Sequence, residues 1–597
     1  MRNPLLLVLS TVLLAGWAAG QSRSRPLADT ILTNARIYTV NARAPWAQAV
    51  AIRDGRILAV GSSRQIASYR GPSTKTLDVR GRLVLPGFID SHIHFVEGSL
   101  AMSQVKLDDT KSVAEIQQVV REFAQAHPAT SPETAWITGR GWSYPEFAPS
   151  GMPHKRFLDQ VLPDRPVLLE GFDGHTYWAN SKALEMAGIT RETPDPLNGK
   201  ILRDPDGEPT GALQEAAGDL VARIVPKATP AERMAAMQAG MVEANRAGLT
   251  RVIICGNDTS GGNDADFFRE YEQLEREGKL TLRFSLSIYA APEGDHAADV
   301  ARADRVLNSH PRTGDWIAAG AVKMFLDGVI EGHTAAMLAP YGDDAKQFGS
   351  LRWDPEQYRK TVADLDRHGI QVFTHAIGDR AVRVALDAYE SAAAQNHTHD
   401  LRHRIEHIET ITAEDIPRFG KLGVIASFQP LHAYPDEDTL GPWLTNAGHQ
   451  REPRAWAWQS IARSGGRLAF GSDWPVVTLN PWQGVQNAVT RQTREGKPAG
   501  GWVPEQRISV AQAVEAYTLG AAFSGHRETQ EGSIEPGKLA DLIVVSQDIF
   551  QVDAPTIGAT EVLITMVGGK IVYESPAWRA ASAESKCDGC GHTRRGR

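Results

Sequence analysis

LPGFIDSHIHF, residues 85–95, places two histidines one residue apart where a run of apolar residues ends. Side chains at positions i and i+2 of a β-strand point to the same side. His92 and His94 can therefore direct their imidazoles to one point, while Ile93 faces the opposite way. Paired histidines are also common on protein surfaces, so the rest of the chain has to distinguish a ligand pair from two surface residues.

Seven further apolar runs follow this stretch, and many of them precede a segment typical of a helix. The eight expected strands cover residues 83–92, 250–255, 282–289, 318–328, 370–379, 402–409, 423–430 and 467–475. Thr412 with Asp415, and Ser509 with Gln512, have the spacing of helix capping boxes. Eight strands that alternate with helices predict an α/β protein whose core is a (β/α)8 TIM-like barrel.

Polar residues that can bind a metal recur at the carboxyl ends of these expected strands. In such barrels this end forms the active-site face. The residues are His92, His94, Lys323, Asp327, His375, His407 and Asp473. Each of them alone can be a satisfied buried polar group, but so many at equivalent strand ends indicate a metal site. Imidazole and carboxylate ligands suit zinc and its neighbours among the divalent ions.

Sequence outside the barrel divides into a second β-structure and an insertion. Alternating apolar and polar residues around Asp54-Gly55, and again around Gly568-Gly569, predict hairpins at both ends of the chain. Together they predict a small β-sandwich built from both termini. The expected boundaries are 28–82 and 529–576 for the sandwich, 83–95 for the first barrel strand, 96–249 for an inserted subdomain with barrel elements, 250–528 for the remaining barrel and 577–597 for a disordered tail.

The first twenty residues have the pattern of a secretory leader. A positive charge at Arg2 precedes the apolar run LLLVLSTVLLAGWAA, and Ala18 and Gly20 provide small residues at the cleavage site. The run is short of the roughly 20 apolar residues that a membrane span needs. We expect residues 1–20 to be removed and the protein to be exported, to the periplasm or beyond, without a stable membrane span.

Composition excludes two other classes of protein. A net charge of −8 over 597 residues gives no basic surface for a nucleic-acid partner. The three cysteines are too few to build the fold from disulfides. CDGCGH at 587–592 resembles half of a zinc ribbon, but no second CxxC exists, so a disordered tail or a local disulfide is expected there.

The motifs together resemble the amidohydrolase superfamily, and within it amidohydrolase family 3, the branch of N-substituted formamide deformylase and the YtcJ-like proteins. The matching stretches are PGFIDSHIH, VKMFLDG…TAAM, THAIGD, RIEH, GSDWP and G.I.PGK.ADL, spread over about residues 30–575. This resemblance implies two divalent ions, expected to be Zn²⁺. The implied ligands are His92, His94 and Asp473 for one ion, His375 and His407 for the other, and a carboxylated Lys323 between them.

Three alternatives to this ligand scheme stay open. Lys323 can form a salt bridge to Asp327 or another neighbour instead of carrying a carboxylate. Cys255 ends the second strand and can be the bridging ligand, because the related D-aminoacylases resemble this pattern with a cysteine bridge. It ranks below Lys323, since small buried cysteines are ordinary core residues. A site with one ion is the third alternative.

The resemblance further implies hydrolysis of a non-peptide C–N bond of the amide or N-formyl type. A metal-activated hydroxide attacks the carbonyl, and Asp473 takes the proton and passes it to the leaving nitrogen. The same site can open an ester or a lactone, and an exported regulatory or binding protein that lost turnover is a third hypothesis. The expected partner is a small-molecule substrate of unspecified identity, and assembly as a homodimer is left open.

Four residues outside the ligand set are candidates for substrate binding. His175 and Asn180 in DGHTYWANS match a stretch that recurs in the family, and Trp142 lies in the expected insertion. At the position of His333, many members of the family that this chain resembles carry an arginine. His432 in SFQPLHAYP is a further pocket residue to consider. His333 and His432 can equally lie on the surface.

Overall fold

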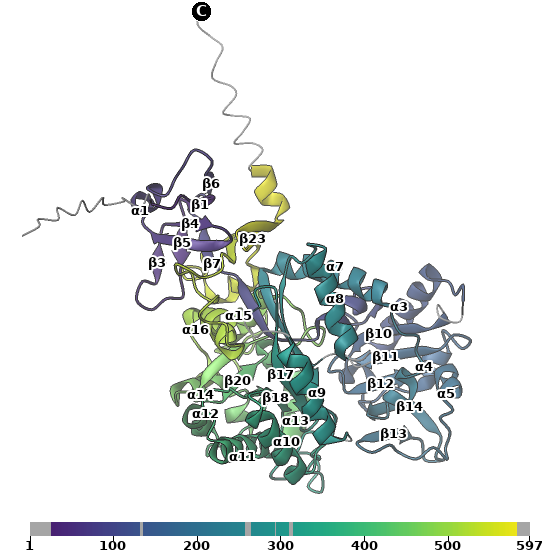
Figure 1. Ribbon diagram of the computed structural model, residues 1–597. Helices are drawn as coiled ribbons and strands as arrows, with labels where there is room; N and C mark the ends of the chain where they lie inside the picture. The colour runs from purple at the N-terminus through teal and green to yellow at the C-terminus, as the bar shows by residue number, and fades with distance from the viewer. Residues whose placement is uncertain (1–24, 132–134, 257–263, 293, 310–313, 582–597) are drawn as a thin grey trace, which may run out of the picture.

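The computed structural model describes residues 25–131, 135–256, 264–292, 294–309 and 314–581. The expected leader and the CDGCGH motif lie outside these residues. Within the described part, a parallel barrel carries a β-sandwich at one end and an inserted sheet at its side (Figure 1).

Eight parallel strands form a nearly closed barrel, as the eight apolar runs predict. Their order in the sheet is their order in the chain, from β8 to β21. Most of their residues are buried, since one face lies inside the barrel and the other is covered by helices. The strands are β8 (Phe88–Ile93), β15 (Leu249–Ile254), β16 (Arg283–Tyr289), β17 (Ile317–Phe325), β18 (Gln371–Ala376), β19 (Arg404–His407), β20 (Ile425–Phe428) and β21 (Arg467–Phe470).

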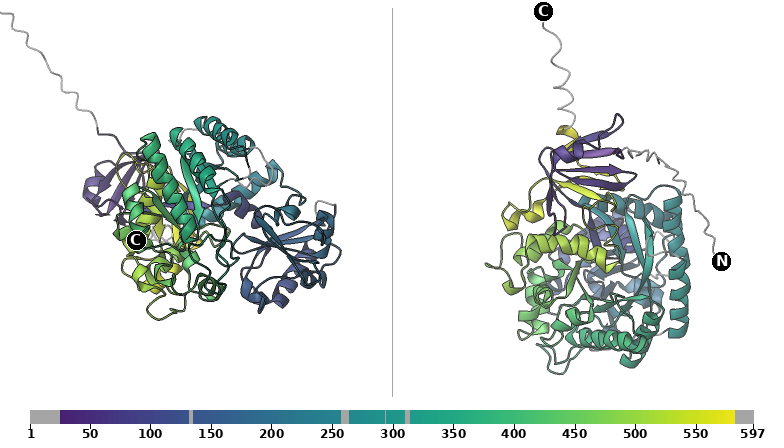
Figure 2. Two further views of the ribbon diagram at one scale, coloured as in Figure 1. Left: turned by 90° about the horizontal axis from the view of Figure 1, so that it is seen from below. Right: turned by 60° about the vertical axis from the view of Figure 1, so that its left-hand side comes forward.

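Helices surround the barrel, and capping groups fix where several of them begin (Figures 1 and 2). Ser509 and Gln512 form the expected capping box at α16 (Val510–Glu515). Thr412 and Asp415 instead close a turn, because the helix α12 begins only at Ile416. The other covering helices include α2 (Phe95–Ala101), α7 (Pro230–Ala247), α8 (Asp264–Arg276), α9 (His296–Asn308), α10 (Pro355–Arg367), α11 (Asp379–Asn396), α14 (Trp458–Arg463) and α15 (Pro481–Thr490).

The first and last barrel strands meet through the residues that follow them. The Asp473 amide donates to the His92 carbonyl at 2.7 Å, and the His94 amide donates to the Trp474 carbonyl at 2.9 Å. The seam of the barrel therefore holds the HxH stretch and the GSDWP stretch side by side.

Both ends of the chain build the β-sandwich. One sheet has the order β5-β4-β1-β6, and the other has the order β24-β23-β22-β7-β2-β3. Between them lies an apolar core that includes Leu32, Val50, Val84, Leu542 and Met566. The strands are β1 (Thr30–Thr33), β2 (Arg36–Tyr38), β3 (Trp46–Ala47), β4 (Ala49–Arg53), β5 (Arg56–Gly61), β6 (Lys75–Asp78), β7 (Leu83–Pro86), β22 (Leu542–Val545), β23 (Val562–Val567) and β24 (Lys570–Glu574).

The structure divides the first expected barrel strand in two. Leu83–Pro86 forms β7, which pairs with β2 and β22 in the sandwich, and only Phe88–Ile93 enters the barrel. Gly87 joins the two, and a Cβ at this glycine would lie 2.2 Å from the Thr250 side chain. The continuous apolar run concealed this division because both sheets bury the strand on both faces.

Residues between β8 and β15 contain a separate mixed sheet with the order β13-β14-β12-β11-β10-β9. It projects from the side of the barrel in Figure 1. The helix α7 that follows packs on the barrel's α2, so the insertion ends before it. No helix in the described residues is both long and apolar enough to cross a membrane. The insert elements are β9 (Val105–Lys106), β10 (Ile137–Trp142), β11 (Val167–Gly171), β12 (Thr176–Ala179), β13 (Gly199–Arg203), β14 (Pro209–Glu215), α3 (Val113–Ala126), α4 (Lys155–Asp159), α5 (Ser181–Ala187) and α6 (Asp219–Ala222).

Candidate metal centre

His92, His94 and Asp473 converge where β8 and β21 meet. Nε2 of each histidine lies 3.2 Å from Oδ1 of Asp473. His92 is fully buried and Asp473 is 5% exposed. The three side chains offer ligand atoms within 4.8 Å of one another, which is close enough for one metal ion.

Two of the candidate ligands sit in left-handed backbone, a region that residues other than glycine rarely adopt. The φ angle is 73° at His407 and 61° at Asp473. Each such residue costs on the order of 1–3 kcal/mol and persists only where its surroundings hold it. The chain turns sharply at the ends of β19 and β21, which presents both side chains on the active face.

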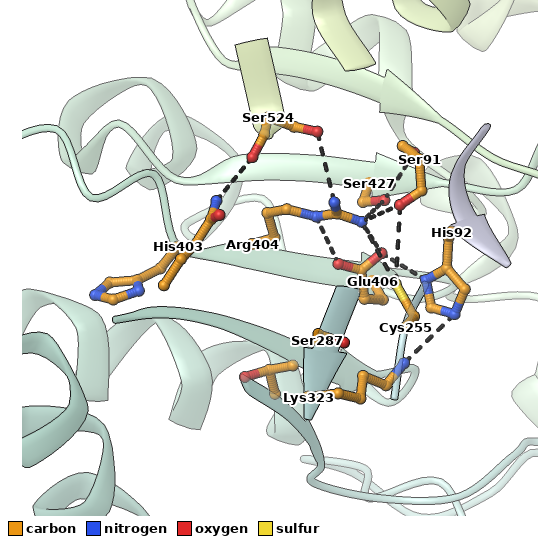
Figure 3. Close-up of polar contacts among 12 residues, drawn as sticks. Ser91, His92, Cys255, Ser287, Lys323, His403, Arg404, Glu406, Ser427 and Ser524 are labelled. Atoms are coloured by element: carbon orange, nitrogen blue, oxygen red, sulfur yellow. Dashed lines mark hydrogen bonds and ion pairs between the residues drawn. The ribbon is translucent and has the colours of Figure 1, made fainter. Parts of the chain in front are cut away.

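Behind His92 lies a buried ion pair that fixes its orientation. Nδ1 of His92 is 2.7 Å from Oε2 of Glu406, so its Nε2 faces Asp473. Arg404 holds Glu406 with two hydrogen bonds, of 2.8 and 2.9 Å, and also donates to the Ser91 carbonyl and the Ser427 hydroxyl (Figure 3). Partners of this kind set the tautomer and basicity of a ligating histidine.

Lys323 points into the same site from β17. Its Nζ lies 3.4 Å from Nε2 of His92, and the side chain is fully buried. Burial lowers the pKa of Lys323. Asp327, the alternative partner, instead accepts the backbone amides of Ala336, Ile377 and Gly378 at 2.8–3.0 Å.

Cys255 also lies within reach of the centre. It groups with His92 and Glu406 as a second set of ligand atoms, and its sulfur is 3.8 Å from the Arg404 guanidinium. The choice between Lys323 and Cys255 as a bridge therefore stays open on geometry.

Three histidines extend the centre towards the other side of the barrel. The ring centroids of His375 and His407 are 4.5 Å apart, and the rings of His407 and His432 stack at 5.6 Å. His432 Nε2 is 3.5 Å from Oδ2 of Asp473. His407, His432 and Asp473 form a further possible ion site. For the second ion the family resemblance implies only His375 and His407, so His432 is an additional candidate ligand.

Buried polar atoms at this centre lack protein partners, which tests whether the residues fit a metal. Nδ1 of His407 and Nε2 of His432 are buried and make no hydrogen bond in the described structure, and Oδ1 of Asp473 is buried with only the Nε2 atoms of His92 and His94 beside it. Such atoms are costly unless something else satisfies them. A divalent cation would satisfy all three, and the nitrogen and carboxylate donors suit zinc.

A cavity of about 120 Å³ opens onto this centre. Its floor is formed by the barrel ligands and its roof by the insert and by the loops after the strands. Its lining includes Asp173, His175, Glu331, His432, Asp438 and Asp473.

Comparison with known proteins identifies the origin of this arrangement. Residues 75–573 match the model of the amidohydrolase family. This chain is a member of amidohydrolase family 3. The predicted resemblance is thereby confirmed over most of the chain.

Three relatives match nearly the whole length of this amidohydrolase. Protein LONG AFTER FAR-RED 3 of Arabidopsis thaliana is 35% identical, over 93% of this chain and 94% of its own. The putative amidohydrolase YtcJ of Bacillus subtilis is 31% identical, over 90% and 98%. N-substituted formamide deformylase of Arthrobacter pascens is 28% identical, over 92% and 98%.

A solved structure supports the fold of the amidohydrolase. An uncharacterized metal-dependent hydrolase from Pyrococcus horikoshii superposes with a TM-score of 0.68 at 24% identity, covering 88% of this chain and 99% of that one.

Two residues that are predicted to bind substrate, Asn180 and Trp142, make structural contacts within the insert, and their role in substrate binding stays a prediction. Asn180 caps α5: its Oδ1 accepts the amides of Ala183 and Val167, and its Nδ2 donates to two carbonyls. Trp142 is fully buried in the core of the insert, where it packs edge-on against Tyr144 and Phe147. Both residues belong to the insert, which contributes to the cavity roof and also has an apolar core of its own.

The two predicted histidines differ in position. His333 pairs with Asp343 at 2.9 Å and is not among the described residues that line the cavity, and its role in substrate binding stays a prediction. His175 lines the cavity, with its Nδ1 3.0 Å from Glu215 and its ring 5.5 Å from that of His375.

The His175–Glu215 pair should make stability depend on pH. Burial by itself lowers the pKa of His175, but the Glu215 carboxylate outweighs it and raises that pKa to about 9. The contribution of this pair to the free energy of unfolding is therefore complete below the pKa of an unfolded histidine, near 6.5, and is lost as pH rises through about 9. Wild type should exceed His175→Gln in unfolding free energy by at most about 3 kcal/mol near pH 6, and by much less near pH 10.

Denaturant unfolding of both proteins at the two pH values measures this difference. His449→Gln is the matched control, because His449 has an 82% exposed side chain. A gap between wild type and His175→Gln that does not change with pH would contradict the assignment.

Sequence reasoning overlooked Arg404 and Glu406, although both stand in the quoted RIEH stretch. The available signal was a pair of opposite charges at i and i+2 within a strand that is otherwise apolar. Such charges share one face and stay buried only when paired.

Proposed function

We propose that the protein is an exported, metal-dependent hydrolase that cleaves a non-peptide C–N bond of the amide or N-formyl type. The observation that carries this proposal is the convergence of His92, His94 and Asp473, the last of which lines a cavity. Membership of the amidohydrolase family supports the reaction class, and the deformylase relative supports the amide-type bond.

The cofactor proposed is a pair of divalent ions, with zinc as the metal. His92, His94 and Asp473 would hold one ion, and His375 and His407 the other, with His432 beside them. When bound, such ions lower the pKa of water and polarise a carbonyl.

Asp473 is proposed to move the proton. Burial alone would raise its pKa, but His92 and the hydrogen bonds from His92 and His94 hold that pKa well below its usual range. The carboxylate is therefore ionised and ready to accept a proton from the attacking water. Its position between the histidines and the cavity lets it release that proton to the leaving nitrogen, which departs readily only as a neutral amine.

Lys323 is proposed to carry a carboxylate. Its lowered pKa favours the neutral amine, whose lone pair can attack CO2. The N–C bond forms, one proton leaves the nitrogen, and the neutral amine becomes an anionic carbamate whose oxygens would be available to the proposed ions. Repulsion between two such ions requires an anion of this kind.

Metal analysis joined to a substrate panel tests the proposal. Protein from its native host should contain close to two divalent ions per chain and should hydrolyse N-formyl or N-acyl amines. His407→Ala should lose mainly one ion. Active protein without metal would contradict the proposed metal centre. Faster hydrolysis of esters or lactones than of amides would favour the alternative reaction. An N-terminus at Met1 in protein from the native host would contradict export.

A further inference from the structure

The cavity beside the metal centre is lined by an unusual number of acidic side chains. They come from four separate parts of the chain: the β11–β12 turn and the segments after β17, β19 and β20. Because these acidic residues come from several segments, they do not form one continuous acidic stretch of the sequence. The five residues are Asp173, Glu331, Glu409, Asp436 and Asp438.

Within the described structure, none of the five pairs with a lysine or an arginine. Asp173 accepts from the Tyr144 hydroxyl, and Glu409 from the Trp443 indole, both at 2.7 Å. The Glu331 backbone carbonyl accepts from the Asn446 amide at 3.2 Å, whereas its carboxylate forms no ion pair with a basic side chain in the described structure. Oδ1 of Asp438 is buried and has no partner. The acids are thus held mainly by neutral donors, and two of them are left facing the cavity.

The charges of these acids oppose one another. Burial, followed by the charges of Glu409 and Asp173, raises the pKa of Glu331 well above its usual range. Burial and the charge of Asp436 raise the pKa of Asp438 to about 7. A cation placed among them would relieve both the repulsion and the lost hydration.

A second feature indicates that this space receives a ligand. Nδ1 of His407 and Nε2 of His432 are buried without a hydrogen bond, and both histidines line the same cavity as Asp473. The acids therefore share a chamber with the reacting centre. The wall also contains four histidines and a group of apolar residues that includes Val329, Leu431 and Val476, and this apolar part suits a hydrocarbon segment.

We propose that the substrate is an amide that carries a second, positively charged nitrogen, as in N-acylated diamines, and that Glu331, Asp438 and Asp173 bind this cation. The assignment rests on the proposed amide hydrolysis. His432 separates the two regions, since its nitrogens lie 3.5 Å from Asp473 and 3.8 Å from Glu409. The cation is therefore at least one imidazole ring away from the reacting carbon, and a short methylene chain joins them.

Matched substrates test the charge preference. N-formyl-1,4-diaminobutane carries a terminal ammonium, and N-formylpentylamine has a methyl group in its place. The metal-replete full-length protein should prefer the first on the order of 100-fold in kcat/KM, because a close charge pair in a buried site contributes strongly. N-formyl-4-aminobutyrate, with a carboxylate at that end, should be the poorest of the three.

Variants assign the preference to the chamber. Glu331→Gln should lower kcat/KM for the ammonium substrate about tenfold or more, and leave the neutral substrate within about threefold. Asp438→Asn tests the same point independently if the first variant folds poorly. Glu275→Gln on the exposed face of α8 is the matched control and should change neither value.

Calorimetric binding of n-butylammonium and n-butanol separates this inference from the proposed reaction. Selective binding of the ammonium ion that Glu331→Gln weakens supports the cation site even if no amide is cleaved. Hydrolysis of neutral amides with no preference for the ammonium substrate would overturn the inference and leave the proposed function intact. Equal binding of both probes would also overturn it.

Discussion

Asp473→Asn is expected to lower turnover by about 10²–10⁴-fold, the usual contribution of general acid–base catalysis. Asparagine keeps the size of the side chain and one oxygen donor, but it cannot take a proton from water. The backbone at Asp473 has a φ of 61°, which asparagine tolerates as readily as aspartate. The variant should therefore fold and retain at least part of its metal.

Metal content, melting temperature and rate are measured on one preparation. Asp54→Asn is the matched control, because Asp54 is exposed in a hairpin turn with a φ of 51°. Near-normal turnover in folded, metal-replete Asp473→Asn would contradict the proton-transfer role. Reduced stability with normal activity in the folded fraction would indicate a purely structural residue.

Arg404→Met is expected to lower the free energy of unfolding by about 3–5 kcal/mol. It leaves the buried Glu406 carboxylate without its guanidinium partner, and it removes the hydrogen bonds to the Ser91 carbonyl and the Ser427 hydroxyl. Because Glu406 orients His92, metal affinity should fall as well.

Denaturant unfolding and metal titration check this result. Arg64→Met at the exposed surface of α1 (Ser63–Ala67) is the matched control. Adding Glu406→Leu to Arg404→Met removes the unpaired charge and should restore part of the lost stability, but not the metal affinity. A loss below about 1 kcal/mol in Arg404→Met would show that the pair is not needed for the fold.

Barrel and ligand positions could be predicted from the sequence because both depend on local patterns. An apolar run of strand length is visible in the sequence, and barrel geometry places whatever follows each run at one face. His92, His94 and Asp473 thus reach one point although Asp473 lies far along the chain.

The remaining features depend on contacts between distant segments. Asn180 accepts the Val167 amide only because β11 lies beside it, and His333, which pairs with Asp343, has left-handed backbone. Glu406 acquires its role from His92 on another strand. The division of residues 83–93 between two sheets has no local signal, since both parts are equally apolar.

Pairing of β7 between β2 and β22 has a consequence for biosynthesis. Residues 83–86 leave the ribosome early, but the strand that covers their second edge is residues 542–545. During nearly all of translation this apolar strand therefore offers unpaired backbone groups to any other chain. Contacts so distant in sequence also form slowly. We therefore expect a chain that stops short of β22 to leave this edge of β7 unpaired and to aggregate more readily than the full-length hydrolase.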